Sequence, residues 1–275
     1  MKIYRRPPLI FLLSATVVAQ VLAFPASNLE KSLRTVTAQD STKPQGAVPI
    51  TNEPHHKLVF ENDYVRAFNV TVQPHEATLL HQHDVPYLYV TLGQTDLINA
   101  VAGKPEMHLV TEDGTTRYTP GPFAHLVRTD SGILFHNITV ELLKPQAGQT
   151  NLGDNSKERP LGSCPQGRGD SEQEAQPASM QTIPCFETSE LRMERVRVDG
   201  GKEFAQASPG EAALLVAMTD ASLDVSIGGK HSAVLHTGDV LWLPAGSARK
   251  VMDARGGKSQ FLLISFKDSS ATETK

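Results

Sequence analysis

Three histidines are the residues of this chain best placed to do chemistry. His81 and His83 are separated by one residue, and His125 follows in a segment that begins at Pro120. Alternate side chains of a β-strand lie on one face, so a His-x-His pair points two imidazoles the same way. A third imidazole from a neighbouring strand would give a metal site with open positions for water or substrate. The spacing predicts a metal centre; the alternative is polar residues on an exposed strand face.

The elements that must hold these histidines are short strands. Runs of β-branched or aromatic residues with a period of two occur at 65–72, 87–92 and 214–218, and Gly, Pro, Asn and Asp separate such runs. No stretch has a convincing helical period. The pattern predicts an all-β protein whose strands close into sandwiches or barrels.

The strands fall into two similar segments, roughly 54–145 and 183–268. Phe60-Glu61, Val65-Arg66 and Val70-Thr71-Val72 align without gaps with Phe186-Glu187, Leu191-Arg192 and Val196-Arg197-Val198, and Tyr118-Thr119-Pro120 matches Trp242-Leu243-Pro244 after a shift of two residues. A nearly constant offset over a whole segment indicates a duplication. We therefore expect two small β-barrels in tandem.

Polar segments flank and separate the two repeats. Residues 24–53 are predicted to form an extended leader, 146–182 a flexible linker rich in Gly, Pro, Ser and Gln, and 269–275 a tail.

The first 23 residues resemble a secretory signal peptide. Lys2, Arg5 and Arg6 precede an apolar run from Leu9 to Leu22, and Val-Leu-Ala at 21–23 is a plausible cleavage site. We expect a secreted or periplasmic protein with no stable membrane span once the signal is removed; a single membrane-spanning helix is the alternative, although the run is short for one.

The cysteine count fits export, and the charge balance bears on the choice of partner. Cys164 and Cys185 are the two cysteines, and an even count in an exported protein suggests a disulfide, with two unpaired thiols as the alternative. Without residues 1–23, the balance of 26 basic to 30 acidic residues becomes 23 to 30. This acidic balance makes nucleic acid an unexpected partner.

These residues resemble the cupin superfamily, whose members are small jelly-roll barrels, and the duplication resembles a bicupin. His81 and His83 occupy the His-x-His places of the first cupin motif, and Gly114, Pro120 and His125 occupy places of the second. The chain also departs from the pattern. His75 stands where Gly is expected, Tyr87 or Leu88 where a Glu ligand is expected, Pro122 for the second Gly and Thr129 for Asn.

The second segment resembles a cupin that has lost its metal ligands. Gly238, Pro244 and Gly246 keep the turns, but Ala207 and Pro209 replace the His-x-His pair, and Arg249 and Asp253 replace the later His and Asn. We expect a degenerate barrel without a metal site. Arg249 could contact a carboxylate or phosphate, with a salt bridge or a rim position as the alternative.

The resemblance implies one divalent first-row metal (Fe, Zn, Ni, Cu or Mn) in the first barrel and a small-molecule substrate or ligand. Asp84 and His75 are candidates for orienting or replacing a ligand, and Tyr87 is a weaker candidate for contacting a bound substrate. Cupins of this kind include dioxygenases, isomerases and lyases. Non-catalytic ligand binding, and a structural bicupin with a vestigial metal site, remain open, as does a homodimer expected from the family alone.

Overall fold

The fold is built from strands. The computed structural model describes residues 44–165, 180–199, 210–226, 230–246, 248–251 and 258–267. The strands are β1 (Val48–Pro49), β2 (His56–Glu61), β3 (Val65–Val72), β4 (His81–His83), β5 (Tyr87–Thr91), β6 (Thr95–Val101), β7 (Met107–Thr111), β8 (Thr116–Thr119), β9 (Phe123–Arg128), β10 (Phe135–Leu142), β11 (Thr150–Asn151), β12 (Met180–Glu187), β13 (Leu191–Asp199), β14 (Ala212–Ala217), β15 (Ala221–Ser226), β16 (Lys230–Leu235), β17 (Val240–Leu243), β18 (Ala248–Val251) and β19 (Lys258–Phe266). One short 3-10 helix, η1 (Ile50–Asn52), joins β1 to β2. None of the described segments forms a helix of the length and hydropathy that crossing a bilayer requires.

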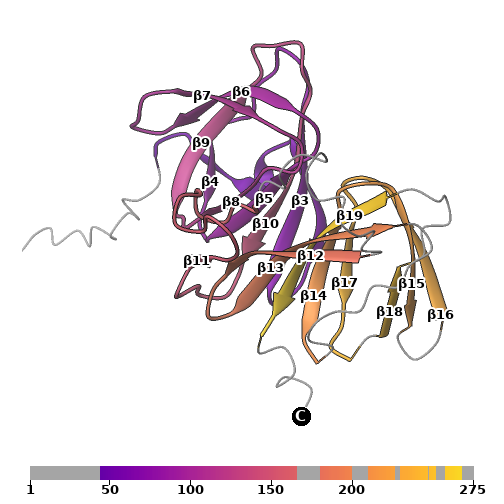
Figure 1. The fold of residues 1–275 in the computed structure, drawn as a ribbon. Coiled ribbons are helices and arrows are strands. Elements are labelled where there is room, and N and C mark those ends of the chain that lie inside the picture. The colour runs from indigo at the N-terminus through magenta and orange to yellow at the C-terminus, as the bar shows by residue number, and fades with distance from the viewer. Residues whose placement is uncertain are drawn as a thin grey trace, which may run out of the picture. The chain divides into compact units, whose positions relative to one another are not determined.

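The N-terminal barrel consists of two five-stranded sheets (Figure 1). The histidine sheet has the order β1-β4-β9-β6-β7, and the central sheet has the order β2-β3-β10-β5-β8. The barrel begins earlier than residue 54. β1 pairs in parallel with β4, Val48 opposite His81, and Ile50 of η1 is only 3% exposed. These elements were hidden in the predicted leader because a two-residue strand and a single turn carry no period that a sequence can show.

The second barrel repeats the plan of the first. Its strands form a six-stranded sheet, β11-β12-β13-β19-β14-β17, and a three-stranded sheet, β16-β15-β18. β13 pairs with both β12 and β19, as β3 pairs with β2 and β10. The register shifts before Phe60 in β2 and before Phe186 in β12, which are equivalent positions of the two repeats. A bulge kept at the same place in both halves supports the duplication.

The middle strands of the central sheet, β3 and β10, carry buried apolar side chains on both faces. On β3, Phe68 and Val70 point into the N-terminal barrel, where they pack with Leu97, Val127 and other residues of the barrel core. Val65 and Ala67, on the opposite face, belong to a different core shared with the second barrel. Successive side chains of a strand lie on opposite faces, so one strand serves two cores.

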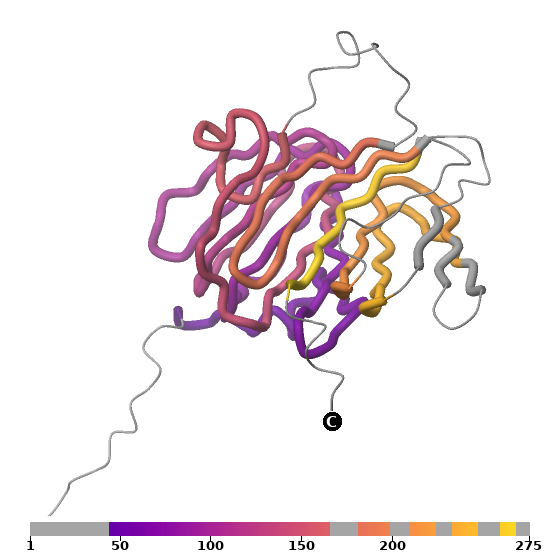
Figure 2. Tube along the Cα trace, turned by 60° about the horizontal axis from the view of Figure 1, so that its bottom comes forward, coloured from indigo at the N-terminus to yellow at the C-terminus, as the bar shows by residue number. Residues whose placement is uncertain are grey.

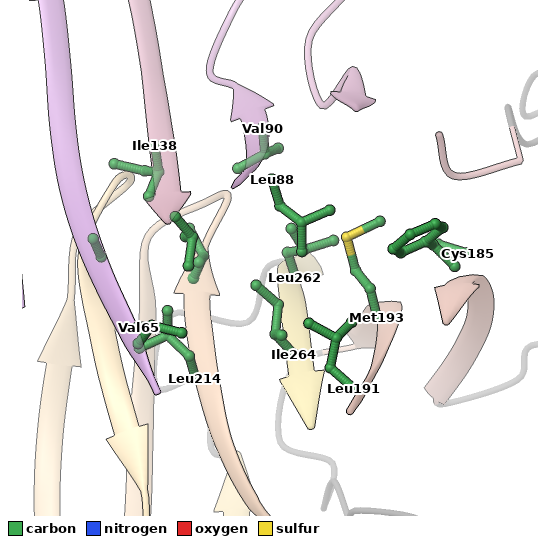
Figure 3. Packing of buried hydrophobic residues seen from close by; sticks show 14 of the residues in the cluster. Val65, Leu88, Val90, Ile138, Cys185, Leu191, Met193, Leu214, Leu262 and Ile264 are labelled. Atoms are coloured by element: carbon green, nitrogen blue, oxygen red, sulfur yellow. The ribbon is translucent and has the colours of Figure 1, made fainter. Parts of the chain in front are cut away.

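The shared core holds the two barrels together. Leu88, Val90 and Ile138 from the central sheet pack with Leu191, Met193, Leu214, Leu262 and Ile264 from the second barrel (Figure 3). Phe60 and Tyr64 extend it by stacking on Trp242, with ring centroids 5.7 and 5.8 Å apart. Burying a large aliphatic or aromatic side chain stabilises by about 1.5–3 kcal/mol, so this interface is a major part of the fold.

The second barrel has a core of its own, filled with apolar side chains. Leu215, Leu223, Leu243, Phe261 and Leu263 are all at most 3% exposed and pack together. The places of Ala207, Pro209 and Asp253, which motivated the prediction of a degenerate barrel, lie outside the described residues.

Residues 146–165 of the segment between the barrels are ordered. Of the range 146–182, residues 146–165 (traced in Figure 2) include β11, which pairs with β12. Cys164, in this segment, forms a disulfide with Cys185. Asn151 donates to the Ser156, Arg159 and Pro160 carbonyls and accepts from the Gly162 amide, which fixes a compact loop. The composition of this segment predicted a flexible linker. Composition cannot show that one buried amide side chain and one disulfide hold the loop in place. Residues 1–43, 166–179 and 268–275, with the predicted signal peptide and tail, lie outside the described part of the chain.

Candidate metal centre

Four histidines converge inside the N-terminal barrel. His81 and His83 lie on β4, His125 lies on the neighbouring β9, and His56 begins β2 on the facing central sheet. All four are at most 9% exposed. His81 and His125 are directly opposite in the antiparallel register, so the sheet itself sets their separation. We call His56, His81, His83 and His125 the four-histidine cluster.

The ring nitrogens of His56, His81 and His83 form one group that could hold a metal ion, and His125 adjoins this group through His83. One ring nitrogen from each of His56, His81 and His83 falls within a group whose members are at most 4.8 Å apart. The His125 Nε2 atom lies 3.3 Å from the His83 Nε2 atom. Two nitrogens that bind one ion at about 2.0–2.1 Å with near-tetrahedral or smaller angles are ~3.0–3.4 Å apart. His83 and His125 are therefore spaced as ligands of one ion.

Hydrogen bonds to the Nδ1 atoms orient three of these rings. His56 Nδ1 lies 2.5 Å from a Glu53 carboxylate oxygen, His81 Nδ1 donates to the Leu79 carbonyl at 2.9 Å, and His125 Nδ1 donates to Asn99 Oδ1 at 2.7 Å. A proton on Nδ1 leaves the lone pair on Nε2, which is the tautomer that a metal requires. Among the described residues, the buried His81 Nε2 atom has no hydrogen-bond partner. A buried acceptor in that state is what a metal ion would satisfy.

Glu53 fixes His56 from behind. Its carboxylate, 2% exposed, accepts hydrogen bonds from the His55 amide, the His55 ring, the His56 ring and the Leu79 amide. Burial would raise the pKa of Glu53, but the hydrogen bonds from His56 and His55 outweigh it and lower the pKa to about 2. Glu53 therefore stays ionised, and through Leu79 it also ties His56 to the strand that carries His81.

Glu141 stands behind His83. Its carboxylate on β10 is 1% exposed, lies 3.6 Å from His83 Nδ1 and forms an ion pair with Arg66 at 3.1 Å. Burial raises the pKa of Glu141, while Arg66 opposes the rise. The second carboxylate thus faces the outer nitrogen of a second candidate ligand.

Burial keeps the imidazoles of His81, His83 and His125 neutral. It lowers the pKa of His81 and of His83 to about 3, with the neighbouring His56 adding to the effect in both, and it lowers the pKa of His125 well below its usual value, with His81 and His83 contributing. Because only the neutral imidazole binds a metal, the site is ready for one at neutral pH.

A cavity of about 80 Å³ adjoins the four-histidine cluster. Its walls combine apolar side chains such as Leu97, Leu109 and Val127 with neutral polar ones such as Asn99 and Asn137. A polar cavity of this size holds several water molecules, which a small ligand could displace.

Comparison with known proteins identifies the architecture. No protein-family model matches the chain, and no curated protein matches its sequence. Three solved structures are similar to it: AerE from Microcystis aeruginosa (TM-score 0.53, 9% identity, covering 78% of this chain and 98% of that one), a variant of salicylate 1,2-dioxygenase from Pseudoaminobacter salicylatoxidans in complex with gentisate (0.53, 15%, 77% and 74%), and vicilin from Capsicum annuum (0.51, 10%, 74% and 76%). The chain has a bicupin fold. At these identities the likeness establishes the fold and nothing finer.

Two departures from the cupin pattern can be compared with the structure: His75 at the position of Gly, and Tyr87 at the position of the Glu ligand. His75, which replaces the first motif's Gly, has a φ of 65°, the left-handed region that Gly adopts most easily. At the place of the family Glu, Tyr87 lines the cavity and stacks on His83, with ring centroids 4.2 Å apart. A further protein donor comes from His56 instead.

The other predicted site residues lie elsewhere. His75 is exposed in the turn between β3 and β4, and Asp84 is exposed after β4, from where its charge favours the protonated form of His83. The buried carboxylates of Glu53 and Glu141 occupy the outer positions for which Asp84 and His75 were candidates. Arg249 lies on β18 opposite Val225, but its side chain is outside what the structure describes.

Sequence reasoning missed His56 because no fixed interval links it to the His-x-His pair. It lies 25 residues before His81 and follows directly after His55, whose ring is partly exposed. The strand itself gives no period-of-two signal, because His56 is the buried residue of β2 and Leu58, two positions later, is 45% exposed. Glu53 was missed because it fell in the predicted leader.

Proposed function

We propose that this bicupin binds one divalent first-row metal in its N-terminal barrel and uses it to transform a small organic molecule. The observation that carries the proposal is the convergence of four buried imidazoles, three of them oriented through Nδ1, beside a cavity. Such a donor set suits Fe, Zn, Ni or Cu better than Mg or Ca.

The chain's own residues would hold the metal and shape the space beside it. The four-histidine cluster would supply the nitrogen ligands, and Glu53 and Asn99 would keep His56 and His125 in the binding tautomer. A bound metal of this kind supplies Lewis-acid activation of an oxygen donor or, as Fe(II), dioxygen chemistry. Tyr87, Leu97 and Val127 would limit water around the ligand.

We favour an oxygenase within this class. The similar fold of salicylate 1,2-dioxygenase, in complex with gentisate, supports this choice. An isomerase or lyase would use the same metal site but would not need dioxygen. A non-catalytic protein would bind its ligand at this site and release it unchanged.

A closed structural metal site is the second candidate, and one observation favours it. Four imidazoles satisfy a four-coordinate ion such as Zn²⁺ completely, which would leave no position for substrate. The cavity beside the cluster argues for a five- or six-coordinate ion with room for a ligand.

Metal content of the purified protein tests the site. We expect about one first-row metal ion per chain in the parent protein and in a His75→Ala control, and little in a His81→Ala, His83→Ala, His125→Ala variant. Equal content in all three would remove the proposal. Oxygen-uptake assays over small phenols, diketones and thiols then separate an oxygenase from a binder.

We also propose that the protein is exported. The signal-like residues 1–23 and the disulfide between Cys164 and Cys185 support this location. Fractionation of expressing cells tests the export. The comparison is a variant in which Lys2, Arg5 and Arg6 are changed to Glu, which should remain inside the cells.

A further inference from the structure

The walls of the cavity carry a second set of neutral hydrogen-bonding groups, apart from the histidines. Asn99 lies on β6 of the histidine sheet, and Asn137 lies on β10 of the central sheet, so the two amides line the cavity from opposing sheets. Tyr87, Tyr89 and Thr139 also line the cavity.

Both amides are oriented by bonds to their oxygens. Asn99 Oδ1 accepts from His125, and Asn137 Oδ1 accepts from Thr139 Oγ1 at 3.2 Å. Each arrangement leaves the side-chain NH₂ as the group with donors to offer. Asn137 is only 7% exposed, so a ligand oxygen in the cavity would be a suitable partner for its donors.

We propose that the site selects an uncharged, oxygen-bearing organic ligand that lies beside the metal and whose oxygen accepts a hydrogen bond from Asn137. This inference rests on the proposed metal site and names its ligand class. Asn137 is then a specificity-determining residue, and Thr139 positions its amide.

The charges around the cavity agree with an uncharged ligand. The lining consists of histidines, neutral polar residues and apolar residues. Arg117, the neighbour of Tyr89 across the β5–β8 pair, donates to the Thr116 carbonyl and lies outside the lining. Arg66 is engaged by Glu61 and Glu141. A carboxylate away from the metal would therefore face amides and aliphatic side chains rather than a guanidinium.

The test uses the full chain loaded with Co²⁺, whose visible absorption reports ligands that enter the metal's surroundings. Three probes are titrated: isobutyramide, its charged isostere isobutyrate, and azide, which needs the metal alone. We expect Asn137→Leu to weaken isobutyramide about tenfold, the loss of roughly one hydrogen bond, and to leave azide unchanged. Arg117→Gln should change none of the three dissociation constants.

The outcomes separate the two proposals. Absence of both the Co²⁺ spectrum and an azide response would remove the metal site itself. An intact azide response with isobutyramide binding equal in parent and Asn137→Leu would overturn the inference alone, as would isobutyrate binding that is tighter than isobutyramide binding and lost in Arg117→Gln. If Asn137→Leu does not fold, Thr139→Val removes the bond that orients the amide, and we expect it to weaken isobutyramide but not azide; no change would again overturn the inference.

Discussion

His81 and His125 face each other across the antiparallel pair of β4 and β9, with their ring centroids 4.5 Å apart. Two residues separated by more than forty positions in the sequence thus form one cross-strand pair of the sheet. The register of that sheet, rather than any flexible loop, fixes the spacing of these candidate ligands. The predictions below follow from this rigid placement and from the groups behind it.

His56 should be as necessary for metal binding as the histidines of β4. Replacing it with Ala removes a ligand from the facing sheet, so we expect the metal affinity to fall by at least about 100-fold. The adjacent His55→Ala is the matched control, because the His55 ring is partly exposed and reaches Glu53 rather than the other histidines. Competition with a chelator gives both affinities; equal loss in the two variants would assign the effect to Glu53 instead of His56.

Glu53→Gln tests the carboxylate behind His56. Loss of a carboxylate that orients a metal-binding histidine costs about 10–100-fold in affinity, and we expect a value in this range. Glu76→Gln serves as the comparison, because the Glu76 side chain is 52% exposed and pairs with the ring of His55. Chelator competition by the two variants should differ clearly, and similar affinities would contradict the role given to Glu53.

The metal-free protein should lose stability as the pH falls from about 6.5 toward 3. In the folded state His81 and His83 have pKa values of about 3, whereas in the unfolded chain they titrate near 6.5. Below 6.5 the unfolded state therefore binds protons that the folded state does not, and each histidine contributes a slope of at most ~1.4 kcal/mol per pH unit. Above 6.5 their contribution is constant.

Urea unfolding at several pH values measures this slope. A His81→Gln, His83→Gln variant should unfold with a shallower dependence on pH than the parent. An unchanged dependence would show that other groups control acid stability. With metal present, release should begin below about pH 6, because protons compete for the same nitrogens.

Leu214→Ala should destabilise the whole chain rather than the second barrel alone. Leu214 is fully buried in the core shared by the two barrels, and truncating such a side chain costs about 2–5 kcal/mol. Val234→Ala, at a site 62% exposed, should cost little. Metal-site absorption and far-UV circular dichroism followed together should report one transition; two separated transitions would mean that the barrels unfold independently.

Reduction of the disulfide should cost about 3 kcal/mol. Cys164 and Cys185 are separated by 21 residues, and a loop of that size loses roughly this much entropy when closed in the unfolded chain. Urea unfolding with and without reductant measures the difference, and a Cys164→Ser, Cys185→Ser variant should be insensitive to reductant. A parent protein that is equally insensitive would contradict the estimate.

The fold could be predicted from the sequence because its two strongest signals are local. Alternation along 65–72 gives strands, and the aligned Phe60 and Phe186 segments give a duplication. The comparisons and the structure confirm the bicupin fold. What could not be predicted is how the central sheet divides its two faces, because both faces are apolar and a period of two does not say which core each face joins.

The candidate site was predictable only where the residues lie at a fixed interval. His81, His83 and His125 belong to a motif, and the structure places all three in one cluster. His56 and Glu141 reach the cluster from β2 and β10 of the facing sheet, and Glu53 from the residue after η1. Contacts between facing sheets leave no fixed interval in the sequence. Asp84 was a candidate because it adjoins His83, but adjacent residues of a strand point to opposite faces.

The Asn137-Ile138-Thr139 sequence has the form of an N-glycosylation sequon, and its burial gives the chain a timing constraint. A sugar attached before β10 enters the barrel would occupy the space between the two sheets, and after folding the amide is inaccessible. In a host that glycosylates exported chains, glycosylation of Asn137 would therefore compete with folding of the barrel. The fraction of molecules with an unobstructed cavity would depend on which process is faster.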